Sequence, residues 1–177
     1  MDSEAGAPES PFRLSPRANP FQQRRTMRTQ AKQGRIVVAG NRPENRDCIR
    51  EILEPAEFEV IIAETGRAAL KEVRETRVSA VIVDFQTAFD SQDPGPPRVG
   101  STLNALRDHD AFLPIVLTCE PNVRVDIETA FMADLILRHP IESAELLDGI
   151  DMLLSESMRE RAARKAHFAA TLDHAAT

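Results

Sequence analysis

Aromatic side chains are scarce in this sequence, which contains eight Phe and neither Trp nor Tyr. Any core must therefore be aliphatic, and hydrophobic residues make up 42% of the chain. No hydrophobic run approaches the roughly 20 residues that a membrane span needs. The first residues also lack the apolar segment of a secretory signal peptide, so we expect a cytoplasmic protein without a membrane span.

Cysteine is nearly missing as well, because the chain contains only Cys48 and Cys119. Their spacing matches neither a metal site nor a disulfide framework, and we interpret both as buried thiols in a reducing compartment. The formal net charge of −6 argues against nucleic-acid binding by the whole chain. A length of 177 residues suits one domain with tails.

Composition divides the chain into three parts. Residues 1–34 are rich in proline and lack apolar periodicity, which predicts a disordered tail with a basic stretch from Arg13 to Lys32. This stretch is either a solvated tail or a contact for an acidic partner, nucleic acid or anionic lipid. Residues 35–155 form the predicted domain. Residues 156–177 are expected to form a solvated helical extension of its last helix, or a tail.

Five short apolar runs follow Gly34 in order, and four of them are continuous and rich in β-branched residues. Such runs are typical of strands buried on both faces. The runs lie at residues 36–39, 60–63, 80–83, 114–117 and 133–137. The third run is followed by a long loop at residues 86–99, whose role the sequence leaves open.

Each run is followed by a segment with helical spacing. The apolar stripes of these five segments are Cys48, Ile49, Ile52 and Leu53; Ala69, Leu70 and Val73; Leu103 and Leu106; Val123, Ile127, Ala130 and Phe131; and Leu146, Leu147, Ile150, Leu153 and Leu154. Strands that alternate with helices predict an α/β domain with one doubly wound, five-stranded parallel sheet and helices on both faces.

Polar residues follow several of the predicted strands. Gly40 and Asn41 follow the first strand, Asp84 ends the third, Thr118 ends the fourth and His139 follows the fifth. Because ligands of doubly wound sheets bind beyond the carboxyl ends of the strands, we expect an acid, a hydroxyl and a base to converge on one edge.

Five segments carry a family resemblance in the expected order and spacing: RIVVAGNRPEN (35–45), AETGRAAL (63–70), AVIVDF (80–85), PIVLTC (114–119) and ADLILRHPI (133–141). Over about residues 35–155, the sequence resembles the receiver domain of bacterial response regulators. The resemblance implies a flavodoxin-like sheet with the strand order 2-1-3-4-5.

The resemblance also assigns residue roles. It implies Asp84 as the phosphoacceptor, Thr118 as the switch hydroxyl, and His139 at the place of a lysine that contacts phosphate. It implies Mg²⁺ as cofactor, held by the phosphoacceptor and two acids after the first strand. Gly40 and Asn41 stand where those acids belong, so Asp84 and Asn41 are the candidate metal ligands.

Residue chemistry leaves these roles open. Asp84 is either phosphorylated or a remnant that caps a turn or hydrogen-bonds Thr118. Thr118 is either a switch or a hydroxyl that satisfies the backbone. His139 is either a phosphate contact or structural, and it carries no permanent charge. Ile136 stands where the family often has an aromatic residue that moves with the signal.

The implied function is a non-enzymatic receiver-like signalling domain in a two-component phosphorelay. Its partners would be a histidine kinase or phosphotransfer protein, a downstream protein target, and a second copy bound through the fourth and fifth helices. The alternative is a phosphorylation-independent receiver used as a scaffold or interaction module. A flavodoxin-like small-ligand domain is disfavoured because no glycine-rich phosphate loop follows the first strand.

Overall fold

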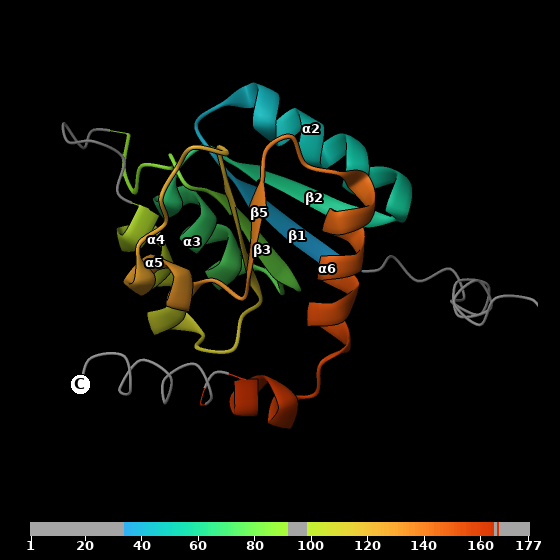
Figure 1. Cartoon of the computed structure of the whole chain (residues 1–177), viewed down its shortest axis with the longest axis vertical. Coiled ribbons are helices and arrows are strands. Elements are labelled where there is room, and N and C mark those ends of the chain that lie inside the picture. The colour runs from blue at the N-terminus through green and yellow to red at the C-terminus, as the bar shows by residue number, and fades with distance from the viewer. Residues whose placement is uncertain (1–33, 92–98, 165, 167–177) are drawn as a thin grey trace, which may run out of the picture. The chain divides into compact units, whose positions relative to one another are not determined.

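Five strands form a single parallel sheet, seen in a computed structural model that describes residues 34–91, 99–164 and 166. The strand order β2-β1-β3-β4-β5 (Figure 1) confirms the predicted doubly wound sheet. The strands are β1 (Gly34–Ala39), β2 (Phe58–Ala63), β3 (Ala80–Asp84), β4 (Ile115–Cys119) and β5 (Leu135–Arg138). β3 lies at the centre, hydrogen-bonded to β1 and β4.

Helices cover both faces of the sheet, as predicted (Figure 1). One face carries α2 and α6, and the other carries α3, α4 and α5. The helices are α2 (Pro43–Leu53), the 3₁₀ turn η1 (Glu54–Ala56), α3 (Gly66–Glu75), α4 (Val99–His109), α5 (Ile127–Met132) and α6 (Ser143–Ser155).

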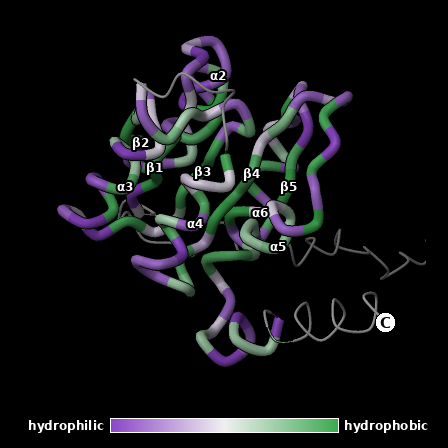
Figure 2. Tube along the Cα trace, turned by 90° about the vertical axis from the view of Figure 1, so that its left-hand side faces the viewer, coloured by the Kyte–Doolittle hydropathy of each residue, from purple (hydrophilic) through white to green (hydrophobic). Residues whose placement is uncertain are grey.

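Apolar strands supply both layers of the core, because successive side chains of a strand point to opposite faces. On β1, Ile36 and Val38 pack with α2 and α6, whereas Val37 and Ala39 pack with α3 and α4. All residues of β3 and β4 are buried, whereas the edge strands β2 and β5 are partly exposed. Figure 2 shows the outcome, with hydrophobic strands inside and more hydrophilic segments around them.

The described start of the long loop after β3 lies against the beginning of α3. The backbone N–H groups of Gly66 and Arg67 donate to the carbonyls of Ala88 and Phe89 at 2.9 and 2.8 Å. Phe89 packs on the core beneath α3. This part of the loop therefore belongs to the α3 side of the domain.

The fourth helix is shorter than predicted, and its predicted inner face is wrong. The spacing predicts a helix with Val123 and Ile127 turned inward, but α5 begins at Ile127, whose side chain is 63% exposed. Asp126 is the N-cap, and its carboxylate accepts a hydrogen bond from the Thr129 N–H at 2.8 Å. The helix starts after Asp126 because this side chain satisfies an N–H group of its first turn.

Cys48 is exposed, so the prediction of two buried thiols is wrong for this residue. α2 turns Ile49 and Leu53 toward the sheet, and Cys48 stands one position outside that stripe. Cys119 is buried in β4, as predicted. Burial raises the pKa of the Cys119 thiol.

Several sequence predictions concern residues outside the described part of the chain. They are the disordered basic tail at residues 1–33, the middle of the long loop at residues 92–98, and the end of the carboxyl-terminal extension at residues 167–177. Among the described residues, no helix has the length and apolar character that crossing a membrane requires.

The carboxyl-terminal segment, predicted as a helical extension or a tail, begins with a helix that is not continuous with α6. The backbone of Glu156 is extended (φ −62°, ψ 131°), and a separate helix begins at Met158 and includes the described residues 158–164 and 166. Two arginines of this helix, Arg161 and Arg164, reach back to the domain. The hydrogen bonds from these arginines to carbonyl and carboxylate oxygens of the domain favour a turn of the chain after α6.

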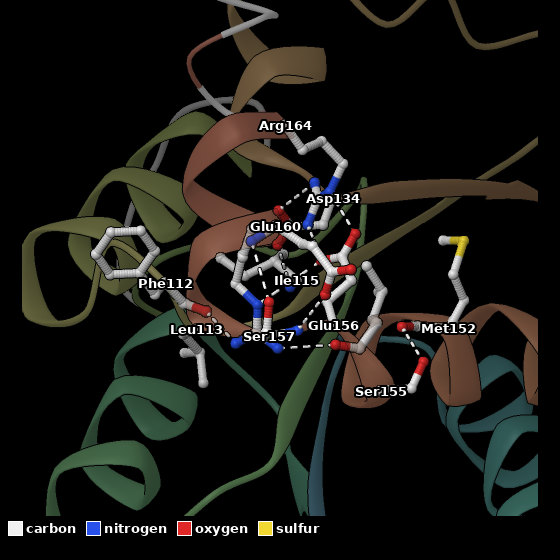
Figure 3. A network of polar contacts seen from close by, with 12 residues as sticks. Phe112, Leu113, Ile115, Asp134, Met152, Ser155, Glu156, Ser157, Glu160 and Arg164 are labelled. Carbon is white, nitrogen blue, oxygen red and sulfur yellow. Dashed lines mark hydrogen bonds and ion pairs between the residues drawn. The ribbon is translucent and has the colours of Figure 1, made fainter.

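Asp134 is the centre of an ion cluster at the amino end of β5 (Figure 3). Its side chain is 1% exposed and accepts hydrogen bonds from Arg107 at 2.7 Å, Arg164 at 2.9 Å and the Ile115 N–H at 2.8 Å. Burial on its own raises the pKa of this carboxyl group. The Arg107 charge and the hydrogen bonds outweigh burial and lower the pKa of Asp134 to about 2.

Asp134→Asn is expected to lower the free energy of unfolding by roughly 2–4 kcal/mol at neutral pH, because two arginines lose their shared buried anion. The folded pKa of about 2 lies below the ordinary 3.8. The stabilisation is therefore complete above the ordinary value and is lost as pH falls through about 2. Denaturant titrations over this range should show the difference between wild type and variant shrinking. Asp148→Asn, at an exposed position of α6, serves as the control. If the difference in unfolding free energy between wild type and Asp134→Asn stays constant with pH, Asp134 is not the buried anion that stabilises the two arginines.

Cys48 is expected to react with a thiol reagent in the native protein, whereas Cys119 should react only after unfolding, because only the thiolate of an accessible cysteine attacks. Absorbance of the released reagent would show one fast thiol in buffer and two in denaturant. Cys48→Ser should remove the fast phase. A fast phase that survives this substitution would show that Cys119 is accessible.

Candidate functional site

Three side chains singled out in the sequence meet at the carboxyl edge of the sheet. Asp84 ends β3, Thr118 is its partner in the β3–β4 register, and His139 directly follows β5. All three fall on the α2 and α6 side, since the residues two positions earlier on each strand pack there. The predicted convergence of an acid, a hydroxyl and a base is therefore present.

The carboxylate of Asp84 is held from two sides. The residue is 6% exposed; Oδ1 accepts a hydrogen bond from the Gln86 N–H at 2.8 Å, and Oδ2 accepts one from Asn45 Nδ2 at 2.8 Å. His139 Nε2 lies 3.7 Å from Oδ2, which is within ion-pair range but too long for a hydrogen bond. Donors from α2 and from the turn after β3 thus stabilise a buried carboxylate.

Asn45 is a site residue that sequence reasoning missed. It lies in the first turn of α2, where the two nearby carboxylates, Glu44 and Asp47, are exposed. Asn45 is only partly exposed and points at Asp84. Its position in the sequence could have indicated this contact. A helix that starts right after β1 places one side of its first turn over the carboxyl edge of the sheet.

Two polar atoms beside Asp84 are buried without a hydrogen bond. They are Thr118 Oγ1 and His139 Nε2, neither of which has a hydrogen-bond partner among the described residues. The interpretation that Thr118 satisfies the backbone or bonds to Asp84 is therefore wrong. Since nearly all buried polar atoms are paired, two such atoms next to a carboxylate mark this edge as the candidate site.

The places of the two missing acids are filled differently. A Cβ on Gly40 would lie 3.3 Å from Asp84 Cβ and 3.6 Å from Arg46 Cγ, so Gly40 adjoins both side chains. Arg46 Nη1 donates to the Gly40 carbonyl at 2.8 Å. Asn41, the second candidate metal ligand, is exposed, and no hydrogen bond joins it to Asp84 in the described part of the chain.

These residues do not fit the Mg²⁺ that the resemblance implies. Mg²⁺ needs near-octahedral oxygen ligands with carboxylates among them, and a glycine and an amide, Gly40 and Asn41, stand where two of those carboxylates are expected. Within residues 34–91 and 99–164, no group of three or more His, Cys, Asp or Glu side chains could hold a metal. The Arg46 guanidinium beside Gly40 adds a positive charge that opposes a divalent cation.

An ion pair joins the loops on either side of Asp84. Arg42, in the loop after β1, donates from Nη1 to Glu120 Oε1 at 2.8 Å, directly after β4. Because β3 lies between β1 and β4, this pair links the loops on both flanks of the end of β3. Sequence reasoning missed the pair, since the two residues are 78 positions apart.

Arg138 does not take part in the site. Strand alternation turns it to the face opposite His139. Its Nη1 donates to the carbonyls of Glu120, Pro121 and Val123 at 3.2, 3.1 and 3.0 Å. Arg138 therefore holds the loop before α5, which leaves His139 as the basic side chain that this strand end brings to Asp84.

The fold of this chain, with its parallel sheet in the order β2-β1-β3-β4-β5, is similar to that of solved response-regulator receiver domains. A response regulator from Chloroflexus aurantiacus matches with a TM-score of 0.61 and 20% identity, over 70% of this chain and 98% of that chain. Response regulator TrrA from Thermotoga maritima, solved in complex with Mg²⁺ and BeF, matches with a TM-score of 0.57 and 24% identity, over 67% and 97%.

A signal receiver domain of a histidine kinase from Syntrophus aciditrophicus is similar as well, with a TM-score of 0.55 and 20% identity over 71% of this chain and 93% of that chain. No protein-family model and no curated protein matches the sequence. At these identities, the likeness shows the receiver fold alone.

Proposed function

We propose that this chain is a non-enzymatic, receiver-like signalling module that docks to partner proteins in a state independent of Mg²⁺-assisted phosphorylation. The observation that carries the proposal is the Asn45–Asp84 hydrogen bond within a receiver fold. It engages one carboxylate oxygen of Asp84, while the Gln86 N–H engages the other. The protein's own donors thus stabilise the charge that a metal would otherwise balance.

These contacts also tie the site loops into one arrangement. Asn45 connects α2 to β3, and the Arg42–Glu120 pair connects the loops after β1 and β4. A domain that responds to a signal needs two states with different contacts. Here one state is held by internal contacts, which supports constitutive docking rather than docking controlled by phosphate.

The surface of α5, β5 and α6 is the proposed docking surface. β5 is an edge strand, so its outer side is open to pairing or packing. Among the described residues, three large hydrophobic side chains are exposed, and two of them, Ile127 on α5 and Met152 on α6, belong to this surface. A downstream target or a second copy of the chain would pack there.

A second candidate function is that of a phosphoacceptor in a two-component relay. It is favoured by one observation, the gathering of Asp84, Thr118 and His139 at one edge with two unpaired polar atoms. In this function a histidine kinase or phosphotransfer protein would place a phosphoryl group on an Asp84 oxygen. Asn45 would have to release that oxygen, and the Thr118 hydroxyl and the His139 imidazole would donate to the phosphate.

Incubation with Mg²⁺ and a small phosphodonor, followed by intact mass measurement, separates the two functions. We expect no phosphate on the wild type under conditions that label an ordinary receiver domain, because Asp84 is buried and no acid pair stands beside it. A gain of one phosphate that vanishes in Asp84→Asn would overturn the phosphorylation-independent proposal and establish the relay function.

A Gly40→Asp, Asn41→Asp double variant tests whether the missing acids are the reason why the wild type should not bind Mg²⁺. The melting temperature of the double variant is expected to rise when Mg²⁺ is added, because the two added carboxylates complete an oxygen site with Asp84. The melting temperature of the wild type should not change. An equal response of wild type and variant would mean that the wild-type residues already bind Mg²⁺.

Self-docking through the α5–β5–α6 surface is expected to appear in sedimentation velocity as a dimer whose population rises with concentration. Ile127→Glu should weaken it, since a charge is placed on the packed surface. Met158→Glu, also at an exposed hydrophobic position but on the carboxyl-terminal helix, is the matched control. A monomer at every concentration, or equal loss in both variants, would contradict docking of a second copy at this surface.

A further inference from the structure

The carboxyl-terminal helix is held to the domain by two arginines. Arg164 donates from Nη1 to Asp134 at 2.9 Å, and from Nε and Nη2 to the Glu156 carboxylate at 2.9 and 2.8 Å (Figure 3). Arg161 donates to the carbonyls of Phe112 at 2.9 Å and Leu153 at 2.8 Å. These bonds connect residues 157–164 to the loop before β4, the amino end of β5 and the end of α6.

The same segment has its own start signal. The Glu160 N–H donates to Ser157 Oγ at 3.2 Å, and the Ser157 N–H donates to Glu160 Oε2 at 2.8 Å (Figure 3). This reciprocal pair is a capping box, which begins a helix without help from neighbouring elements. With the extended backbone of Glu156 before it, the segment is a separate unit joined to α6 by a hinge.

Hydrophobic burial contributes little to the attachment. Met158 is 58% exposed, and Ala162 and Ala163 are exposed as well. α6, in contrast, buries Leu146, Ile150 and Leu153 against the sheet. Among the described residues, the attachment therefore depends on charge-assisted hydrogen bonds of Arg161 and Arg164, and removal of one of these side chains should weaken it.

The domain side of the contact does not require the segment. Asp134 keeps Arg107 and the Ile115 N–H as partners if Arg164 leaves. Arg107 in turn donates to the carbonyls of Met132 and Leu113, which fastens the end of α5 and the loop before β4. Release of the segment therefore leaves the sheet and its inner ion pair in place.

We propose that residues 157–164 form a latch that detaches as a unit from the Asp134–Glu156 acidic pair while the five-stranded domain stays folded. In the closed state, the latch connects the amino end of β5 to the carboxyl end of α6 through Asp134 and Leu153. Open, it exposes an acidic pair that fits a guanidinium group. A role of the latch in controlling the α5–β5–α6 surface rests on the proposed docking function, but the latch itself does not.

Spin-label mobility at position 158 tests the latch. The label is placed with Met158→Cys in a Cys48→Ser background, where the buried Cys119 stays unlabelled. We expect a restricted label when Arg161 and Arg164 are both present, because their hydrogen bonds hold the helix against the domain. Arg164→Gln should give a mobile label, and Arg159→Gln, which changes an exposed arginine on the same helix, should behave as wild type.

Hydrogen exchange on the same samples decides whether the latch opens as a unit. Amides of residues 158–164 are expected to exchange roughly ten- to a hundredfold faster in Arg164→Gln, with the amides of β3 and β4 unchanged. A restricted label in both Arg161→Gln and Arg164→Gln would overturn the proposal. So would faster exchange of β3 and β4 in step with the helix. Neither label mobility nor hydrogen exchange depends on phosphate or on dimer formation. A result that contradicts the latch therefore leaves the proposed function untested, and the reverse holds as well.

Discussion

Parallel hydrogen bonding of β3 between β1 and β4 is the constraint on which the rest of the site depends. It brings the carboxyl ends of three strands to one edge and sets Asp84 in the middle of that edge. Three elements around that edge then bring polar side chains to the carboxylate. They are the helix after β1 with Asn45, the end of β4 with Thr118, and the residue after β5, His139. Strand alternation chooses among their residues, because it sends His139 toward Asp84 and Arg138 away from it.

A buried carboxylate must be stabilised, and this protein does so with its own donors. Asn45 and the Gln86 N–H bind the two oxygens of Asp84, while the space of a missing acid at Gly40 adjoins the Arg46 side chain. The same fold could hold a cation only if carboxylates surrounded this corner. With Gly40, Asn41 and Arg46 around it, the Asp84 carboxylate is bound at both oxygens by donors of the chain.

The two ends of the sheet carry two buried aspartates that are stabilised in different ways. At the carboxyl end, neutral donors hold Asp84 and leave Thr118 and His139 with unused polar atoms. At the amino end, Arg107 and Arg164 hold Asp134 so strongly that the pKa falls to about 2. The first arrangement suits a site that meets other molecules, and the second suits a junction between elements of the same chain.

The order of apolar runs and helical stripes determined the fold, because burial on both faces leaves continuous apolar runs that can be read directly from residues such as those of β1, β3 and β4. The convergence of Asp84, Thr118 and His139 also followed from their places after strands. Local spacing could not show that Asn45 binds Asp84, that Arg42 meets Glu120, or that Arg164 reaches Asp134, because each pair is far apart in the chain. The short α5 and the exposed Cys48 were misjudged for a related reason. Periodicity reports which residues could share a face, but caps and the position of the helix over the sheet decide which of them are buried.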